Sequence, residues 1–265
     1  MRRKYLIFVM HIVFILLSAS VAFAEKRMFV FAGQSNMVGM ARTYDFPGEY
    51  QSLPSNIVMY VEGSAKEFRA SGKRQGWGPE ISFAREMAKR CPDDTIIIVK
   101  YAVGATSLYG WRKDWSESGG LTANDRKAPH YSKLMALVRD IAAKEQVKPS
   151  AFFWLQGEAD HNHGSTFSEY RDMFSMFIRD IRKDLGAEYL PFIFGRLQRY
   201  EYAARSEVRD AQDAVSSSAG NTKMVTTDDL RRIDRVHYDA EGLILIGKRF
   251  AEAYLGFANR TVLPK

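Results

Sequence analysis

The sequence is poor in cysteine: Cys91 is the only one in 265 residues. A single thiol cannot form a disulfide within the chain, so a small disulfide-stabilised fold is excluded. No pattern typical of a catalytic cysteine surrounds Cys91, and we interpret it as a structural thiol in or near the core. Histidine is also scarce, with five residues, which leaves few candidates for a general base.

Blocks of lysine and arginine are absent as well, although basic residues outnumber acidic ones. The formal net charge of the whole sequence is +7. Arg231, Arg232 and Arg235 do cluster, but a solvated loop explains them. We therefore predict no nucleic-acid partner. The composition, 46% hydrophobic and 26% charged, is ordinary for a globular α/β domain.

The first 24 residues have the layout of a secretory signal peptide. A basic start at residues 2–4 precedes an apolar run over residues 6–17, and the segment ends in the A-x-A pattern of residues 22–24. This predicts cleavage after Ala24 and a secreted or periplasmic enzyme without stable membrane insertion. Cleavage removes three basic residues and no acid, so the formal charge falls from +7 to +4. The alternative is an uncleaved anchor that just reaches across a bilayer.

Residues 25–265 predict one domain, because no repeat, low-complexity tract or linker interrupts them. Apolar runs bounded by turn residues predict five strands, at residues 27–32, 56–61, 95–102, 150–156 and 191–197, and a short edge strand at 223–227. Apolar spacings of three and four predict helices, at residues 79–90, 131–146, 167–185 and 240–255. Gly186 and Gly256 follow the last two helices as C-terminal caps. Alternating strands and helices predict an α/β fold, a three-layer α/β/α sandwich with a mostly parallel five-stranded sheet.

Ser35 follows the first predicted strand at once, in the segment GQSNM of residues 33–37. In such sheets the ligand site lies outside the carboxyl ends of the strands. A serine at a sharp strand-to-helix turn is exposed beside backbone N–H groups that can hold an oxyanion. Taken alone, the motif fits a helix N-cap better.

Asp234 and His237 lie three residues apart, just before the last predicted helix. On a helical turn that spacing brings two side chains together. The carboxylate can then accept from one ring nitrogen while the other takes a proton from a serine. Combined with Ser35, the pair favours a Ser-His-Asp triad, which neither motif favours alone.

Other polar residues follow the third and fourth predicted strands. The amide of Gln156 is a candidate oxyanion donor, and Gly104 lets a backbone N–H approach a ligand, although a tight turn explains it equally. Three roles stay open for Glu158: orienting Gln156, pairing with an arginine, or binding substrate. His161 and His163 suggest a metal, but no known ligand spacing completes a site, and a second base or a substrate contact is favoured slightly.

Aromatic residues cluster after the third predicted strand, at Tyr109, Trp111 and Trp115. Aromatic faces at this edge either stack on sugar rings or pack the core, and the sequence does not choose. Trp111 and Trp115, together with Glu158, are therefore candidates for substrate contact or support.

Three ordered blocks, GQSNM, WLQGEAD and DRVHYDAEG, resemble the SGNH hydrolase superfamily. Within it they look like the carbohydrate esterases grouped with sialate O-acetylesterases and acetylxylan esterases. The segments GWGPEISFAREMAK and YAVGATSL look similar too, so the likeness spans most of residues 25–265. The resemblance implies a flavodoxin-like sandwich with no metal and no cofactor.

The resemblance also implies roles for individual residues. Ser35 is the nucleophile, His237 the base, and Asp234 orients the base. The oxyanion hole comes from the N–H groups of Ser35 and Gly104 and from Gln156. Where many SGNH enzymes have a Gly-x-Asn-Asp block, this chain has Gln-Gly-Glu at residues 156–158, which is typical of this esterase branch and leaves the role of the glutamate open.

Together these observations predict an exported serine esterase that hydrolyses O-acetyl esters on a carbohydrate through an acyl-enzyme intermediate. Plant xylan, sialylated glycans and a cell-wall sugar all stay open as substrates. A short-chain lipase or thioesterase, or an O-acetyltransferase, would use the same triad. A non-catalytic carbohydrate-binding module would keep the aromatic residues but has no need of the triad.

Overall fold

The computed structural model describes residues 24–72, 76–200 and 206–262. The predicted signal peptide lies outside these ranges except for its last residue, Ala24. The strands are β1 (Lys26–Gly33), β2 (Ile57–Val61), β3 (Ser64–Ala65), β4 (Thr95–Ala102), β5 (Pro149–Leu155), β6 (Phe192–Gly195) and β7 (Thr222–Val225). The α-helices are α1 (Ser35–Val38), α2 (Glu80–Arg90), α3 (His130–Glu145), α4 (Glu158–Asn162), α5 (Phe167–Asp184), α6 (Glu207–Ser218) and α7 (Ala240–Val262). Among these described residues, no helix is both long and apolar enough to cross a membrane.

One sheet carries all the strands, in the order β3-β2-β4-β1-β5-β6-β7. Every neighbouring pair is parallel except β2 and β3. The predicted α/β class with a mostly parallel sheet is confirmed, but the prediction of a five-stranded sheet is wrong, because the sheet formed by the described residues has seven strands. The short edge strand β7 does pair with β6, and the two-residue β3 is too short to leave an apolar pattern in the sequence.

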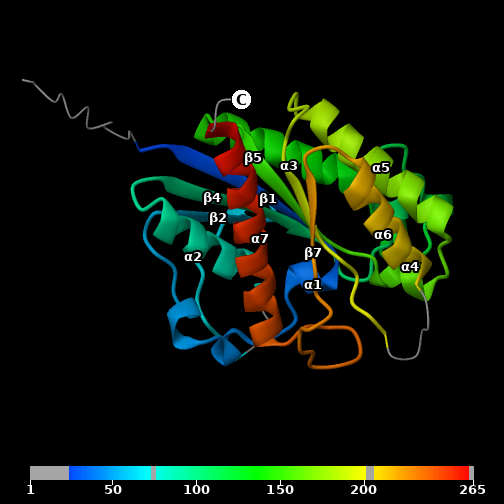
Figure 1. Ribbon diagram of the computed structural model, residues 1–265, viewed down its shortest axis with the longest axis horizontal. Helices are drawn as coiled ribbons and strands as arrows, with labels where there is room; N and C mark the ends of the chain where they lie inside the picture. Colours follow the sequence, from blue (N-terminus) through cyan, green and yellow to red (C-terminus); the bar gives the residue numbers. More distant parts are fainter. Residues whose placement is uncertain (1–23, 73–75, 201–205, 263–265) are drawn as a thin grey trace, which may run out of the picture.

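Both faces of the sheet are covered by helices, as β1 illustrates. Phe29 and Phe31 pack into one cluster with residues of α2 and α7, whereas Met28, Val30 and Ala32 pack into a second cluster with residues of α3, α5 and α6. Figure 1 shows these two groups of helices on opposite sides of the sheet. Because successive side chains alternate between two buried faces, the strand reads as a continuous apolar run.

The four predicted helices are present as α2, α3, α5 and α7. Gly186 caps α5 as predicted, with φ of 59°. The prediction that Gly256 caps the last helix is wrong, because α7 continues past it to Val262. Helix α6 was not predicted, since most of its residues are polar and its apolar stripe is narrow.

The centre of the sheet sets up the site. At its carboxyl end β1 lies between β4 and β5, where Gly33 pairs with Ala102 on one side and with Leu155 on the other. The residues that follow these three strands therefore start from the same edge of the sheet. This edge is where a parallel sheet places its ligands.

Candidate active site

Ser35 lies at a sharp turn between β1 and α1. Gly33 has φ of 148°, and a Cβ atom there would lie 2.2 Å from the Leu155 carbonyl oxygen, so only glycine fits this close approach. The next N–H, that of Gln34, donates to the same oxygen at 3.0 Å. The strand therefore stops abruptly, and Ser35 becomes the first residue of α1.

The structure brings Ser35, His237 and Asp234 together, although the first two lie 202 positions apart in the sequence. The His237 Nε2 atom lies 3.1 Å from the Ser35 hydroxyl, and Nδ1 lies 2.8 Å from Asp234 Oδ2. A carboxylate can only accept a hydrogen bond, so Nδ1 carries the ring proton. Nε2 is then free to accept the proton of the Ser35 hydroxyl.

Asp234 is held as a carboxylate by its neighbours. Its Oδ1 accepts from the backbone N–H groups of Val236 at 2.8 Å and His237 at 2.7 Å. Partial burial alone would raise the pKa of Asp234, but the hydrogen bonds from the His237 ring and from these two N–H groups lower it to about 2. The nearby Asp228 pairs instead with Arg209, at 2.6 Å.

Asn36 connects the segment carrying the histidine to the start of α1. Its Oδ1 accepts from the Tyr238 N–H at 3.1 Å, and its Nδ2 donates to the Val236 carbonyl at 3.1 Å and to Glu158 Oε1 at 2.5 Å. Asn36 therefore binds the backbone on both sides of His237. Sequence reasoning did not single it out, although it adjoins the candidate nucleophile.

Glu158 is buried next to Asn36, and burial raises the pKa of its carboxyl group. Its Oε2 has no hydrogen-bond partner among the described residues. The Glu158 side chain accepts a hydrogen bond from the Asn36 amide instead of bonding to Gln156 or to an arginine. Two of the three predicted roles, orienting Gln156 and pairing with an arginine, are therefore wrong.

Gln156 does not line the cavity at Ser35 and its amide is bonded to the protein, which contradicts the predicted oxyanion role. Both hydrogens of its amide are used, in bonds to the Thr106 carbonyl at 3.1 Å and to Asp160 at 2.5 Å, and its Oε1 accepts from Tyr170. The physical reason is the alternation of side chains along β5: Gln156 follows Trp154 by two residues and points to the same face, beneath α5.

Gly104 does lie beside Ser35, the candidate nucleophile. A Cβ atom built on it would lie 3.7 Å from Ser35 Cβ, an ordinary contact, so the fold itself does not demand glycine here. The next residue, Ala105, adopts φ of 52°, which is uncommon for a residue with a side chain. Within the described ranges, neither the Ser35 nor the Gly104 N–H group donates to a protein acceptor.

Trp111 is packed into the core, so its candidacy for sugar stacking is wrong. It is fully buried, its ring contacts Trp154, and its indole N–H donates to Thr106 at 3.0 Å. Trp115 is half-buried and donates to the Asp125 carbonyl at 2.6 Å, away from the cavity at the nucleophile. Both tryptophans therefore support loops, since each indole N–H donates to a residue in the connection between β4 and α3.

The two histidines of the middle block separate. The His161 ring stacks on Tyr200 with centroids 4.7 Å apart, while His163 lines the cavity at the nucleophile. Over residues 24–72, 76–200 and 206–262, no group of three His, Cys, Asp or Glu side chains is placed to hold a metal ion.

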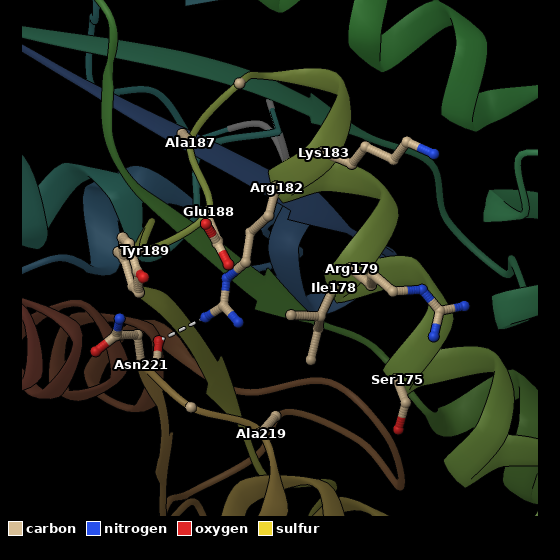
Figure 2. Close-up of a pocket in the computed structure, with 12 residues that line it drawn as sticks. Ser175, Ile178, Arg179, Arg182, Lys183, Ala187, Glu188, Tyr189, Ala219 and Asn221 are labelled. Carbon is tan, nitrogen blue, oxygen red and sulfur yellow. Dashed lines mark hydrogen bonds between the residues drawn. The ribbon is translucent and has the colours of Figure 1, made fainter.

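A cavity of about 650 Å³ opens above the triad, with Ser35, Gly104, Leu121, Asn124, His163 and His237 in its wall. A larger cavity of about 870 Å³ lies at the C-terminal end of α5 (Figure 2). Its walls include Tyr189 and Asn221, which precede β6 and β7, so it sits at the opposite end of the sheet. Arg182 in its wall donates to the Asn221 carbonyl at 2.8 Å and thereby satisfies the backbone.

Asp160 is a buried carboxyl group beneath the active site. Its Oδ2 accepts from the Leu108 N–H at 2.9 Å and from Gln156, whereas its Oδ1 has no partner in the described part of the chain. Burial raises the pKa of Asp160 from 3.8 to about 7.

We expect Asp160→Asn to remove a pH-dependent loss of stability. The unfolded carboxyl ionises near pH 4 and the folded one only near pH 7, so the free energy of unfolding of the parent falls through this window by about 1.4 kcal/mol per pH unit. Asparagine does not titrate, and its single carbonyl oxygen can take the place of Asp160 Oδ2 and accept both hydrogen bonds. Urea unfolding at pH 5 and pH 7 measures the effect, with the exposed Asp172→Asn as control. An unchanged difference between the two pH values would contradict this assignment.

The chain matches one family model, described as carbohydrate esterase, sialic acid-specific acetylesterase, over residues 25–256. No curated protein matches it. A solved protein from Arabidopsis thaliana is 21% identical with a TM-score of 0.70, covering 88% of this chain and 98% of that one. NanS is 16% identical with a TM-score of 0.69, covering 91% and 99%.

A carbohydrate acetylesterase from Xanthomonas citri is 19% identical to the chain, with a TM-score of 0.65. The match covers 86% of this chain but 55% of the Xanthomonas protein, so the chain spans about half of that relative. At these identities the solved structures show a common fold. The type of reaction is inferred from the family match instead.

Proposed function

Since the chain belongs to the carbohydrate esterase family of sialic acid-specific acetylesterases, it is a carboxylic ester hydrolase, and we propose that it removes O-acetyl groups from a carbohydrate with Ser35 as nucleophile. The observation that supports this most is the hydrogen-bonded series from the Ser35 hydroxyl through His237 to Asp234. It joins a nucleophile, a base and a group that orients the base.

In the acylation step the Ser35 oxygen attacks the acetyl carbonyl carbon while His237 Nε2 takes the hydroxyl proton. Asp234 stabilises the imidazolium that forms, because its low pKa keeps it ionised. The tetrahedral intermediate then collapses, the bond to the sugar oxygen breaks, and Nε2 returns the proton to that oxygen. The sugar leaves with a free hydroxyl, and the acetyl group stays on Ser35.

In the deacylation step a water molecule takes the place of the sugar. His237 Nε2 accepts a proton from the water as its oxygen attacks the acyl-enzyme carbonyl. Collapse of the second tetrahedral intermediate breaks the bond to Ser35 Oγ, which regains the proton, and acetic acid is released. The N–H groups of Ser35 and Gly104 face the negative oxygen in both intermediates.

We further propose that residues 25–265 form a single esterase domain that is exported after cleavage at Ala24, because residues 2–24 have the pattern of a signal peptide. An acetylated glycan outside the cytoplasm is the matching substrate class. A non-catalytic binding module is set aside, since the family is one of ester hydrolases.

We expect kcat/KM to fall at least about 10-fold from acetyl to octanoyl esters. The cavity wall beyond Ser35 carries Asn124, Asn162 and His163 among apolar residues such as Leu121, and a long acyl chain would cover these polar groups without replacing their hydrogen bonds to water. Hydrolysis of p-nitrophenyl acetate, butyrate and octanoate measures the trend. A rate that rises with chain length would support the lipase alternative. Acetate release from acetylated glycans would then identify the sugar.

A further inference from the structure

We propose that the side-chain amide of Gln34 is the third oxyanion-hole donor, in place of Gln156. This assignment rests on the proposed function, because it requires Ser35 to be the nucleophile. Gln34 directly precedes Ser35 and lines the same cavity as Ser35, Gly104 and His237. The strand-to-helix turn thus supplies a side-chain donor beside the backbone donor of Ser35 itself.

The orientation of the Gln34 amide is set by the backbone at the start of α4. The N–H groups of Gly157 and Ala159 both donate to Gln34 Oε1, each at 3.3 Å. Backbone N–H groups can only donate, so the oxygen of the amide must face them and the NH₂ group must face away. Gly157 reaches this position with φ of 143°, a conformation that L side chains rarely adopt.

The NH₂ group of Gln34 is left available to a ligand. Among the described residues no acceptor bonds to Gln34 Nε2, and this atom is not one of the fully enclosed polar atoms that lack a partner. Gln34 as a whole is only 2% exposed, so its amide contacts the cavity rather than open solvent. A donor that is held in place but has no protein acceptor is what a developing oxyanion requires.

The two glutamines that follow strands at this edge therefore differ in which end of the amide is bonded to the protein. Gln156 Nε2 donates both hydrogens, to Thr106 and Asp160, and its side chain does not line the cavity. In Gln34 the side-chain oxygen accepts hydrogen bonds from the protein, and the NH₂ hydrogens have no acceptor among the described residues. Only the second arrangement stabilises negative charge that appears on the substrate.

Gln34→Glu is the most informative substitution. A glutamate keeps an oxygen for the Gly157 and Ala159 N–H groups, which preserves the local fold, but it replaces the donor with a second oxygen. We expect kcat on p-nitrophenyl acetate to fall by about 10²–10³-fold, the usual cost of losing one oxyanion donor, with KM changed less than about threefold. Gln34→Met, which removes both polar atoms, is expected to lose activity to a similar extent.

Inhibition by a small boronic acid separates a catalytic from a structural role. Its tetrahedral adduct with Ser35 places an oxygen where the oxyanion forms, so we expect the inhibition constant to rise by the same factor by which kcat/KM falls. Losing activity with an unchanged inhibition constant would overturn the assignment, as would less than a threefold loss of kcat in folded Gln34→Glu. Full activity in Ser35→Ala would instead overturn the proposed function itself.

Gln156→Met provides the matched comparison. If Gln34 is the donor, folded Gln156→Met keeps kcat within about 10-fold of the parent and loses thermal stability, because three buried hydrogen bonds go unmade. A loss of about 10²-fold or more in Gln156→Met, with Gln34→Glu near parental activity, would return the role to Gln156.

Discussion

Replacing Ser35 by alanine is expected to reduce kcat on an aryl acetate by about 10⁴-fold or more. The substitution removes the oxygen that forms the acyl-enzyme, and His237, which lies 3.1 Å from it, then has no hydroxyl proton to accept. The remaining rate comes from substrate binding and the oxyanion donors. Steady-state kinetics of the purified variant measure the loss. Labelling by a fluorophosphonate, which reacts with activated serines, is expected to disappear with it.

The control is a serine of the same type elsewhere. Ser175, on α5, donates to the Arg171 carbonyl at 2.7 Å and is far from the triad, so Ser175→Ala is expected to keep parental activity and labelling. The double variant Ser35→Ala/His237→Ala is expected to be no slower than either single variant, because the two side chains act as a unit. Additive losses, or parental turnover in Ser35→Ala, would contradict the assignment.

Replacing Asp234 by asparagine is expected to lower kcat by about 10³–10⁴-fold. The N–H groups of Val236 and His237 donate to Asp234 Oδ1, so the asparagine oxygen must occupy that position. Its NH₂ group then faces His237 Nδ1, which becomes an acceptor and gives its proton to Nε2. A protonated Nε2 cannot take the hydroxyl proton of Ser35. Kinetics at fixed pH measure this loss.

Asp234→Ala provides the comparison, because it leaves the ring unanchored without imposing the wrong tautomer. We expect it to be at least as active as Asp234→Asn. Asp229→Asn is the control, since Asp229 is exposed and pairs with Arg249 away from the triad. Because the pKa of Asp234 is about 2, Asp234 stays ionised at neutral and mildly acidic pH and does not itself limit activity there. Parental kcat in Asp234→Asn would remove the orienting role.

The sequence was sufficient to predict the central strands and the meeting of Ser35 with His237 and Asp234. Buried parallel strands read as apolar runs, and the position after a strand together with the spacing of three constrains these three side chains strongly. Helix α6 was not predicted because its few buried apolar residues, such as Val208 and Val215, are separated by polar ones.

The two glutamines show why the rest of the site could not be read from the sequence. Gln34 and Gln156 both follow strands that end at the active-site edge. Which amide is available depends on partners far away in the chain, such as Thr106 for Gln156 and Ala159 for Gln34. Trp111 is a similar case, since only its packing against Trp154 distinguishes a core residue from a sugar platform.

Ser35 and His237 lie 202 positions apart in the sequence, and this separation has a consequence for when activity appears during folding. Ser35 directly follows the first strand of the fold, and His237 lies in the segment just before the last helix, so no partial chain that ends before His237 contains all three side chains of the proposed triad. Such distant pairings form late, after the entropy of closing a long loop has been overcome. Recovery of hydrolysis during refolding is therefore a measure of the last long-range docking step rather than of helix formation.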